Sequence, residues 1–332
     1  MGVSVLSRPT LSAAEAAEIA AEWWGINGAG SPLPSERDQN FLIEGEDGRY
    51  VLKVANRAED RAVLDMQNRA MERLRRAGIP CPDPIRDRTG NDIAGIGHHL
   101  ARMVRWVDGR PLAEIHPRPS ELLRDLGRTM GAVDRALDGF DHPAASRDLY
   151  WDVRHAEGVI AERLKAVTPT TRRELVRRAL DRHAATVRPV LATLRSGVIH
   201  NDANDHNVLV DAGARRVTGL LDFGDTVRTF VVNEVAVAAA YAMLGEAEPL
   251  DAAREVVMGY VESARLEDAE REVLLDLVRI RLATSVTVAA HQHALRPDDP
   301  YLTVSEDQAW ELLERLDRVD PEAAATAFSD RP

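Results

Sequence analysis

Short apolar runs separated by turn residues fill the first third of the chain, which is the pattern of β-strands joined by hairpins. Residues 41–43 and 50–54 are two such runs, and Gly45-Glu46-Asp47-Gly48 between them predicts a tight turn. Residues 98–107 form a third apolar run. The sequence therefore predicts a small sheet in this part of the chain.

Two helices are predicted beside this sheet. Residues 12–24 are rich in alanine, begin at Ser12, which can cap a helix, and end before Gly25. Residues 59–76 have one face on which positions recur at helical spacing, namely Val63, Gln67, Met71 and Leu74. Gln67 is the polar member of this face, and it either has a role in a site or is an inert helix position.

Helical periodicity dominates from residue 119 onward. Apolar stripes run through residues 122–137, 171–191, 233–244 and 279–293, and Ser305-x-x-Gln308 opens a last helix. The run 233–244 is apolar on all sides, so we expect it to be buried. Thr171-x-x-Glu174 has the spacing of a capping box. A sheet-bearing first part and a mostly helical second part predict an α+β protein.

One stretch inside the helical part follows a different pattern. The apolar pair Val198-Ile199 leads into His200-x-Asp202-x-x-x-x-Asn207, a predicted hairpin over 207–221 follows, and then comes Asp222-Phe223-Gly224. A single His-x-Asp would be explained by an aspartate that caps a turn. Two such boxes separated by one hairpin are more specific, and they have the spacing of a kinase catalytic loop and its metal-binding loop.

Phosphoryl transfer explains why these residue types are needed. The reaction requires a positioned group that accepts the hydroxyl proton and charges that neutralise the phosphates. Asp202 is the candidate catalytic base. The hairpin should bring Asn207 and Asp222 together, and their amide and carboxylate oxygens suit Mg²⁺. The sequence thus predicts Mg²⁺ as cofactor and a nucleoside triphosphate as phosphoryl donor.

Lys53 lies among apolar neighbours on the predicted strand 50–54. Such a lysine is either an edge residue that prevents aggregation or a ligand of nucleotide phosphates. Its position upstream of the Asp202 motif favours the phosphate role. Kinases place a glutamate on the following helix to pair with this lysine. Here Gln67 stands on that face, and it can accept a hydrogen bond from Lys53 but contributes no charge.

Further nucleotide contacts are expected from two loops. The chain has no Gly-x-Gly-x-x-Gly, so the polar loop that begins at Ser35 would have to cover the phosphates. The segment 103–107 fits a hinge whose backbone, at residues such as Arg105 and Val107, would hydrogen-bond the nucleotide base.

Composition and charge indicate which kinds of partner and which cellular compartment to expect. The net charge of −12 comes without a basic stripe, which argues against nucleic acid and, more weakly, favours a cationic acceptor. No stretch approaches the length of apolar sequence that spans a bilayer. Neither a signal peptide nor a second cysteine beside Cys81 is present, which fits a reducing cytoplasm. We expect a cytoplasmic monomer or homodimer.

These motifs resemble the aminoglycoside phosphotransferase-like small-molecule kinases, and most of all hydroxylysine kinase and its bacterial relatives. The resemblance spans nearly the whole chain. Its more specific elements are SERDQNF at 35–41, HNDANDHNVLVD at 200–211, GLLDFGD at 219–225 and RLATSVTVAAHQHALRPDDPYL at 281–302.

The resemblance implies a protein-kinase-like bilobal fold. A small N-terminal lobe with an antiparallel sheet, residues 1–106, would bind the nucleotide. A larger, mostly helical lobe, residues 107–332, would carry catalysis and the acceptor site. By position, Asp202 becomes the base, Asn207 and Asp222 the metal ligands and Lys53 the phosphate lysine.

The implied donor is ATP or GTP, and the implied acceptor is the hydroxyl of a small amine or amino acid similar to hydroxylysine. Asp205, His206 and Asp225 are candidates for binding the acceptor, and solvated loop residues are the alternative. An antibiotic kinase is a second interpretation of the chain. A nucleotide-binding regulator without catalysis is a third, although intact Asp202 and Lys53 argue against it.

Overall fold

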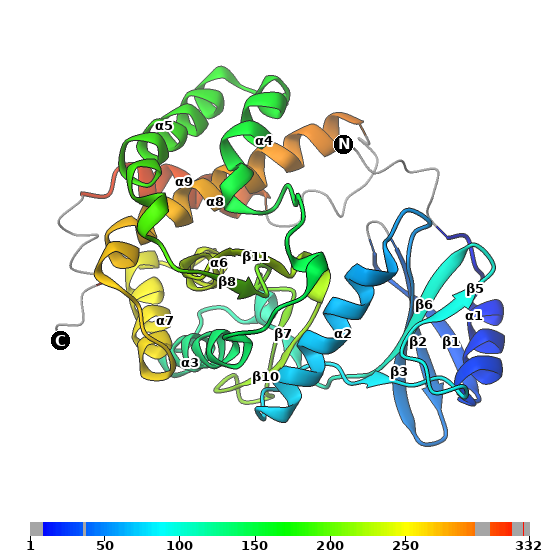
Figure 1. The fold of residues 1–332 in the computed structure, drawn as a ribbon. Coiled ribbons are helices and arrows are strands. Elements are labelled where there is room, and N and C mark those ends of the chain that lie inside the picture. Colours follow the sequence, from blue (N-terminus) through cyan, green and yellow to red (C-terminus); the bar gives the residue numbers. More distant parts are fainter. Residues whose placement is uncertain (1–8, 36–37, 296–305, 321–327, 329–332) are drawn as a thin grey trace. The chain divides into compact units, whose positions relative to one another are not determined.

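The structure, a computed structural model, describes residues 9–35, 38–295, 306–320 and 328. The chain divides into two compact units (Figure 1). The N-terminal unit is Met1–Asp108 together with His142–Ala145, and the C-terminal unit is Gly109–Asp141 together with Ser146–Pro332.

An antiparallel sheet forms the centre of the N-terminal unit, in the order β1-β2-β3-β6-β4 with β5 also paired to β6. The strands are β1 (Gly28–Leu33), β2 (Gln39–Gly45), β3 (Gly48–Val54), β4 (Pro84–Ile85), β5 (Ala94–Ile96) and β6 (His99–Arg105). The strands expected at 41–43, 50–54 and 98–107 are confirmed as β2, β3 and β6. The sequence analysis does not predict β1, β4 or β5.

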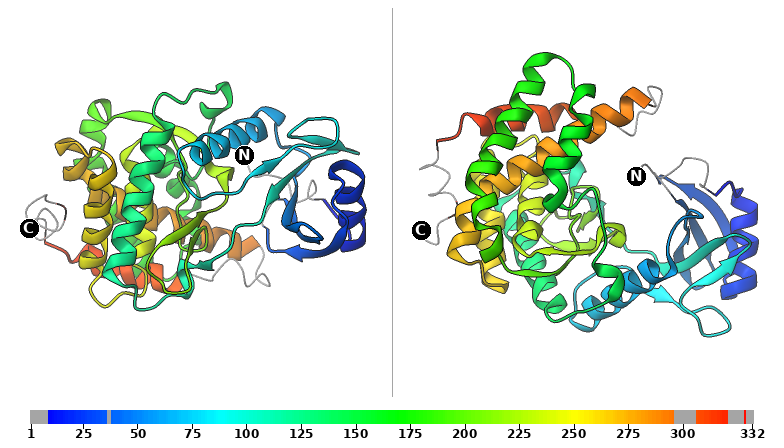
Figure 2. Two further views of the ribbon diagram at one scale, coloured as in Figure 1. Left: turned by 90° about the horizontal axis from the view of Figure 1, so that it is seen from below. Right: turned by 45° about the horizontal axis from the view of Figure 1, so that its top comes forward.

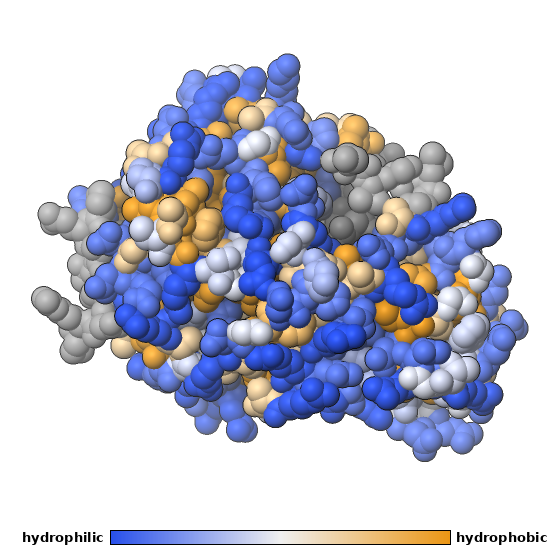
Figure 3. All heavy atoms as spheres, viewed as in Figure 1, coloured by the Kyte–Doolittle hydropathy of each residue, from blue (hydrophilic) through white to orange (hydrophobic). Residues whose placement is uncertain are grey.

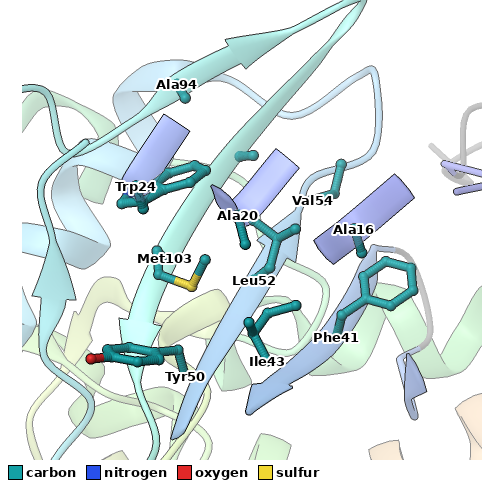
Figure 4. Packing of buried hydrophobic residues seen from close by; sticks show 11 residues of the cluster. Ala16, Ala20, Trp24, Phe41, Ile43, Tyr50, Leu52, Val54, Ala94 and Met103 are labelled. Atoms are coloured by element: carbon teal, nitrogen blue, oxygen red, sulfur yellow. The ribbon is translucent and has the colours of Figure 1, made fainter. Parts of the chain in front are cut away.

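Helix α1 (Ala13–Ile19) packs on one face of this sheet and continues as a π-helical turn over Ala20–Trp24. Ser12 and Glu15 form a capping box at its start, which confirms the predicted cap. Figure 4 shows the apolar core between this helix and the sheet, where side chains of α1 and its extension meet Phe41, Ile43, Leu52, Val54 and Met103.

Helix α2 (Arg61–Arg76) lies on the opposite face of the sheet (Figure 1). Asp60 caps its N-terminus by accepting the N–H of Ala62 over 2.8 Å. The four residues predicted to share the inward face, Val63, Gln67, Met71 and Leu74, are all buried. This helix therefore brings a buried amide, Gln67, toward the face of the sheet that carries Lys53.

The C-terminal unit is mostly helical, as expected. Its helices are α3 (Ser120–Leu137), α4 (Ala156–Arg163), α5 (Thr170–Thr186), α6 (Val232–Ala242), α7 (Pro249–Ser263), α8 (Asp268–Leu295) and α9 (Glu306–Asp317). Helix α6 packs against α3 and α7 on one side and against α8 on the other, and α8 in turn contacts α4, α5 and α9 (Figure 1).

The expectations about these helices have different outcomes. The burial of α6 is confirmed. The sequence analysis predicts neither α4 nor α7, and it starts α8 too late. The capping box at Thr171 is wrong, because α5 begins at Thr170 after Pro169 and no side chain caps it. Ser305 lies outside the described residues.

Among the described residues, no helix is long and apolar enough to cross a bilayer. The face shown in Figure 3 is largely hydrophilic, with apolar side chains in small groups.

Helices α3 and α7 approach each other closely enough that their backbones touch (Figures 1 and 2). A Cβ atom on Gly259 would lie 1.9 Å from the carbonyl oxygen of Arg124, and one on Gly127 would lie 1.9 Å from that of Val256. Neither position has room for a methyl group. The crossing that supports α6 from below therefore depends on glycine.

We predict that Gly259→Ala lowers the free energy of unfolding by about 1–3 kcal/mol, because the helices must separate to admit the methyl group. Urea denaturation measures the change. Gly158→Ala is the matched control, since Gly158 lies in α4 and a Cβ there meets nothing within 4 Å. That control should be neutral or stabilising by up to about 1 kcal/mol. An unchanged midpoint for Gly259→Ala would contradict the prediction.

Candidate active site

The 200–207 loop connects two pairs of strands in the C-terminal unit. β8 (Ser196–Ile199) enters it and pairs antiparallel with β11 (Val227–Phe230). β9 (Val208–Val210) leaves it and pairs with β10 (Val217–Leu220), which confirms the expected hairpin. The N–H of Leu221 donates to the carbonyl of Asn207 over 2.7 Å. The chain after this bond begins with Asp222.

Hydrogen bonds hold both carboxylate oxygens of Asp202. Oδ1 accepts from Nη2 of Arg281 over 2.9 Å. Oδ2 accepts from the side-chain amide of Asn204 over 3.0 Å and from that of Asn207 over 2.7 Å. The side chain retains 16% of its surface exposed, which leaves it within reach of a hydroxyl group. Its orientation is thus fixed from three directions while one side stays open.

The pKa of Asp202 is raised well above its ordinary value, first by burial and then by the negative charge of Asp225. Arg281 opposes this shift, and Asp222 adds to it. The negative charges of Asp222 and Asp225 therefore disfavour the charged form of Asp202. A carboxylate whose proton affinity is raised in this way suits general-base chemistry.

His200 links the 200–207 loop to the segment before Asp222. Its Nδ1 accepts the N–H of Asp202 over 3.2 Å, so the proton lies on Nε2, which donates to the carbonyl of Leu221 over 2.9 Å. Burial lowers the pKa of His200 to about 4. Its ring meets Phe223 edge to face, with centroids 4.8 Å apart. His200 is a neutral connector between the two motifs and not an acid or base.

Glu234, on α6, supports the loop from the protein interior. Its Oε2 accepts the N–H of His200 over 2.6 Å and that of Asn201 over 3.3 Å. Asn201 has a positive φ of 68°, which turns successive N–H groups toward this single oxygen. Glu234 is fully buried, and burial raises its pKa to about 7. The sequence analysis assigns this residue no role, although a glutamate stands out in the mostly apolar α6.

Asn207 and Asp222 fit a divalent cation. Both hydrogen bonds of the Asn207 side chain use its nitrogen, toward the carbonyl and the carboxylate of Asp202, and neither uses its oxygen. The exposed carboxylate of Asp222 accepts the N–H of Gly224 over 3.1 Å through one oxygen. An amide oxygen and a carboxylate on adjacent strand ends are ligands that Mg²⁺ accepts alongside phosphates and water.

The three candidates for acceptor binding lie in different environments. Asp205 is buried, and one of its oxygens lies 3.4 Å from Nη2 of the fully buried Arg118. His206 is exposed, and its N–H donates to Asn204. Asp225 is 7% exposed and close enough to Asp202 to raise its pKa. Asp225 is therefore the one whose charge reaches the candidate base.

In the N-terminal unit, Lys53 on β3 lies directly opposite Arg102 on β6. Opposed residues of an antiparallel pair point to the same face, so two cations stand side by side facing α2. Oε1 of Gln67 accepts from Nη2 of Arg102 over 2.6 Å, and Oδ1 of Asn68 accepts from Nη1 over 2.9 Å. Gln67 thus accepts a hydrogen bond from Arg102, and its expected bond to Lys53 stays a prediction.

The remaining nucleotide-binding candidates are spread along the unit. Ser35 is half-buried two residues after the end of β1, next to residues outside the described range. The guanidinium of Arg105 lies 5.4 Å from the ring centroid of Tyr50, on the face opposite Lys53. The N–H of Arg105 already donates to Asp83, so a base would have to use its carbonyl or the half-buried Val107. These roles stay predictions.

Residues 29–272 match the phosphotransferase enzyme family, APH. The chain belongs to this family. Its expected α+β fold, with an antiparallel sheet followed by a mostly helical part, is confirmed. A solved structure titled as amicoumacin kinase hAmiN in complex with AMP-PNP, Ca²⁺ and Ami aligns with a TM-score of 0.71 at 15% identity. That alignment covers 94% of this chain and 97% of the other.

Two curated relatives identify the class of enzyme. Hydroxylysine kinase of Mus musculus is 29% identical and covers 93% of this chain and 90% of its own length. Homoserine kinase of Gluconobacter oxydans is 27% identical and covers 71% of this chain and 73% of its own length. The phosphotransferase assignment made from the Asp202 and Asp222 motifs is confirmed: this family member is a kinase with a hydroxyl acceptor.

Sequence reasoning missed two residues of the site, Glu234 and Arg281. Arg281 begins the RLATS stretch that was one of the specific signs of the resemblance, so a signal was present without a role attached to it. For Glu234, the useful sign is a glutamate inside a helix that is otherwise apolar, since such a charge needs a buried partner.

We predict that Glu234→Ala lowers the free energy of unfolding by about 1–3 kcal/mol, because two buried N–H groups lose their acceptor. Turnover should fall as well, since the loop carries Asp202. Glu234→Gln is the matched control that retains an acceptor oxygen. Thermal unfolding and steady-state kinetics on both variants make the comparison, and equal stability of the alanine variant and wild type would contradict it.

The same pair of variants tests the raised pKa of Glu234. In the folded state this carboxyl keeps its proton up to about pH 7, whereas in the unfolded state it releases it near its ordinary value of 4.5. Between these values the unfolded state binds fewer protons, so wild-type stability falls as pH rises. Relative to wild type, Glu234→Gln should therefore gain stability from pH 5 to pH 7. A constant difference across that range would refute the shift.

Proposed function

We propose that this phosphotransferase moves the γ-phosphoryl group of ATP or GTP to a hydroxyl of a small amine-bearing metabolite similar to hydroxylysine. The observation that carries the proposal is the Asp202 carboxylate, held by Asn204, Asn207 and Arg281 beside the Asn207–Asp222 pair. The similarity to hydroxylysine kinase over most of both chains supports the acceptor class.

In this proposal Asp202 accepts a hydrogen bond from the acceptor hydroxyl and takes its proton as the phosphoryl group transfers. The fixed carboxylate aligns the hydroxyl oxygen, which contributes positioning more than proton affinity. Asn207 and Asp222 would hold Mg²⁺, which neutralises phosphate charge when bound. Lys53, with Arg102 beside it in the sheet, would bind phosphate oxygens from the N-terminal lobe of residues 1–106.

An amine-bearing acceptor fits the charge around the base. The negative charges of Asp222 and Asp225 both act on Asp202. A substrate ammonium would be attracted by this potential and would in turn favour the ionised form of the base. Antibiotic phosphorylation is the second candidate, and the structural similarity to amicoumacin kinase favours it. In both candidates the phosphoryl group goes to a hydroxyl of an amine-bearing acceptor, so the acceptor must be found by assay.

A coupled assay of nucleoside diphosphate release tests the proposal. ATP and GTP are each crossed with hydroxylysine, homoserine, choline, ethanolamine and several aminoglycosides. We expect the highest kcat/KM with a small amino alcohol or hydroxy amino acid. If an aminoglycoside gives the highest kcat/KM, the acceptor is an antibiotic and not a small metabolite. No turnover with any pair would favour a nucleotide-binding regulator.

We predict that Asp202→Asn lowers kcat by about 10²–10⁴-fold, the usual contribution of a positioned acid or base. Asp211→Asn is the matched control, because Asp211 caps the turn of the neighbouring hairpin by accepting the N–H groups of Arg215 and Arg216. It should retain most of the wild-type turnover. Near-normal kcat in Asp202→Asn would show that another group takes the proton.

A further inference from the structure

Arg281 is a buried cation on α8 directly behind the proposed base. Its side chain is 2% exposed. The guanidinium lies between two aromatic rings, 4.8 Å from the centroid of Trp151 and 5.7 Å from that of Tyr241. Aromatic faces attract a desolvated cation, so these rings replace part of the water that the guanidinium has lost.

The guanidinium is also held in its plane by hydrogen bonds. Nη2 donates to Oδ1 of Asp202 over 2.9 Å, and Nη1 donates to the carbonyl of Trp151 over 3.2 Å. The adjacent Asp152 is fully buried and accepts from the hydroxyl of Thr229 over 2.6 Å, which fixes the segment that carries Trp151 to β11. Arg281 therefore connects Asp202 to a rigid frame made of α8, α6 and β11.

Stability alone does not explain why a charged pair is buried here. A buried ion pair often contributes no more than apolar residues of similar size, because both charges lose their hydration. An apolar side chain between Trp151 and Tyr241 would pack without that cost. We therefore expect the role of Arg281 to lie in the chemistry of its charged partner, Asp202.

We propose that Arg281 is a positioning residue for phosphoryl transfer, which orients the carboxylate of Asp202 toward the acceptor hydroxyl. This role of Arg281 rests on the proposed function in one respect, which is the assignment of Asp202 as the base. Arg281 fixes Oδ1 while Asn204 and Asn207 fix Oδ2, so the carboxylate can neither rotate nor retreat. The positive charge also offsets the charges of Asp202 and Asp225.

A direct role in binding an acceptor carboxylate is less compatible with the contacts. The guanidinium is almost wholly covered, and its two terminal nitrogens already donate to Asp202 and Trp151. With only 2% of the side chain exposed, the guanidinium offers almost no surface to an acceptor. The role therefore acts through Asp202 and should appear in kcat more than in the KM of either substrate.

Arg281→Met and Arg281→Lys test the role. Methionine fills the space between the rings but removes both hydrogen bonds, and we expect kcat to fall by about 10²-fold, the usual effect of a misplaced reacting group. Lysine keeps the charge without the planar two-point fork, so kcat should fall roughly tenfold with near-normal stability. The KM for nucleotide should stay within about twofold in both, since neither variant alters a phosphate contact.

Arg279→Met is the matched control on the same helix. Arg279 is equally buried, but it donates to Asp276 and to the carbonyl of Leu316, away from the base. This control should lose stability and keep kcat. If Arg281→Met proves too unstable to assay, Arg281→Lys decides the matter, and wild-type kcat in that variant overturns the proposal.

A double-mutant cycle separates this proposal from the proposed function. In an Asp202→Ala background, Arg281→Met should lower kcat by less than about threefold, because there is no carboxylate left to orient. A loss as large as in the wild-type background would assign Arg281 a role independent of Asp202 and overturn the proposal. Near-normal kcat in Asp202→Ala alone would instead reject Asp202 as the base.

Discussion

The site depends on the two hydrogen bonds that the buried Glu234 side chain accepts from the backbone. One oxygen of this side chain receives the N–H groups of His200 and Asn201, where the chain leaves β8 and turns into the loop. A backbone that turns in the protein interior needs an acceptor for these groups, because water cannot reach them. This turn places His200 in the interior, where burial keeps it neutral, and leads the chain to Asp202. Helix α6 in turn rests on α3 and α7, whose glycine-mediated contact holds it in place.

The site is a set of buried polar groups that hydrogen-bond one another although they lie far apart in the sequence. Arg281 is 79 residues from Asp202, and Glu234 is 34 residues from His200. Burial of any one of these groups without a hydrogen-bond partner would destabilise the fold. Burial is tolerated because a helix or a strand holds each partner in place. Asp202 is the exception, because one side of its carboxylate stays exposed. An acceptor hydroxyl needs that space in order to reach it.

Local patterns explain which parts of this picture the sequence could predict. The hairpin between Asn207 and Asp222 is short, with apolar strand residues on both sides of Ala212-Gly213, so its strands and turn follow from neighbouring residues. β1 is missed because GAGSPL contains glycine and proline where strands usually have branched side chains. Arg281 and Glu234 lack roles in the sequence because their partners are distant in the chain, and periodicity carries no information on such pairs. The arginine that contacts Gln67 is likewise found only when β6 is placed beside β3.

Backbone conformation at the two motifs has a consequence for attempts to improve this protein. Asn201 and Asp222 both have left-handed φ values, 68° and 54°, which cost an ordinary side chain on the order of 1 kcal/mol. Glycine adopts these angles freely but offers no oxygen to a metal ion. Selection for a higher unfolding temperature alone would therefore reward glycine at Asp222 and remove a proposed metal ligand. Stability and activity impose opposite requirements on that residue, so a useful screen must measure both.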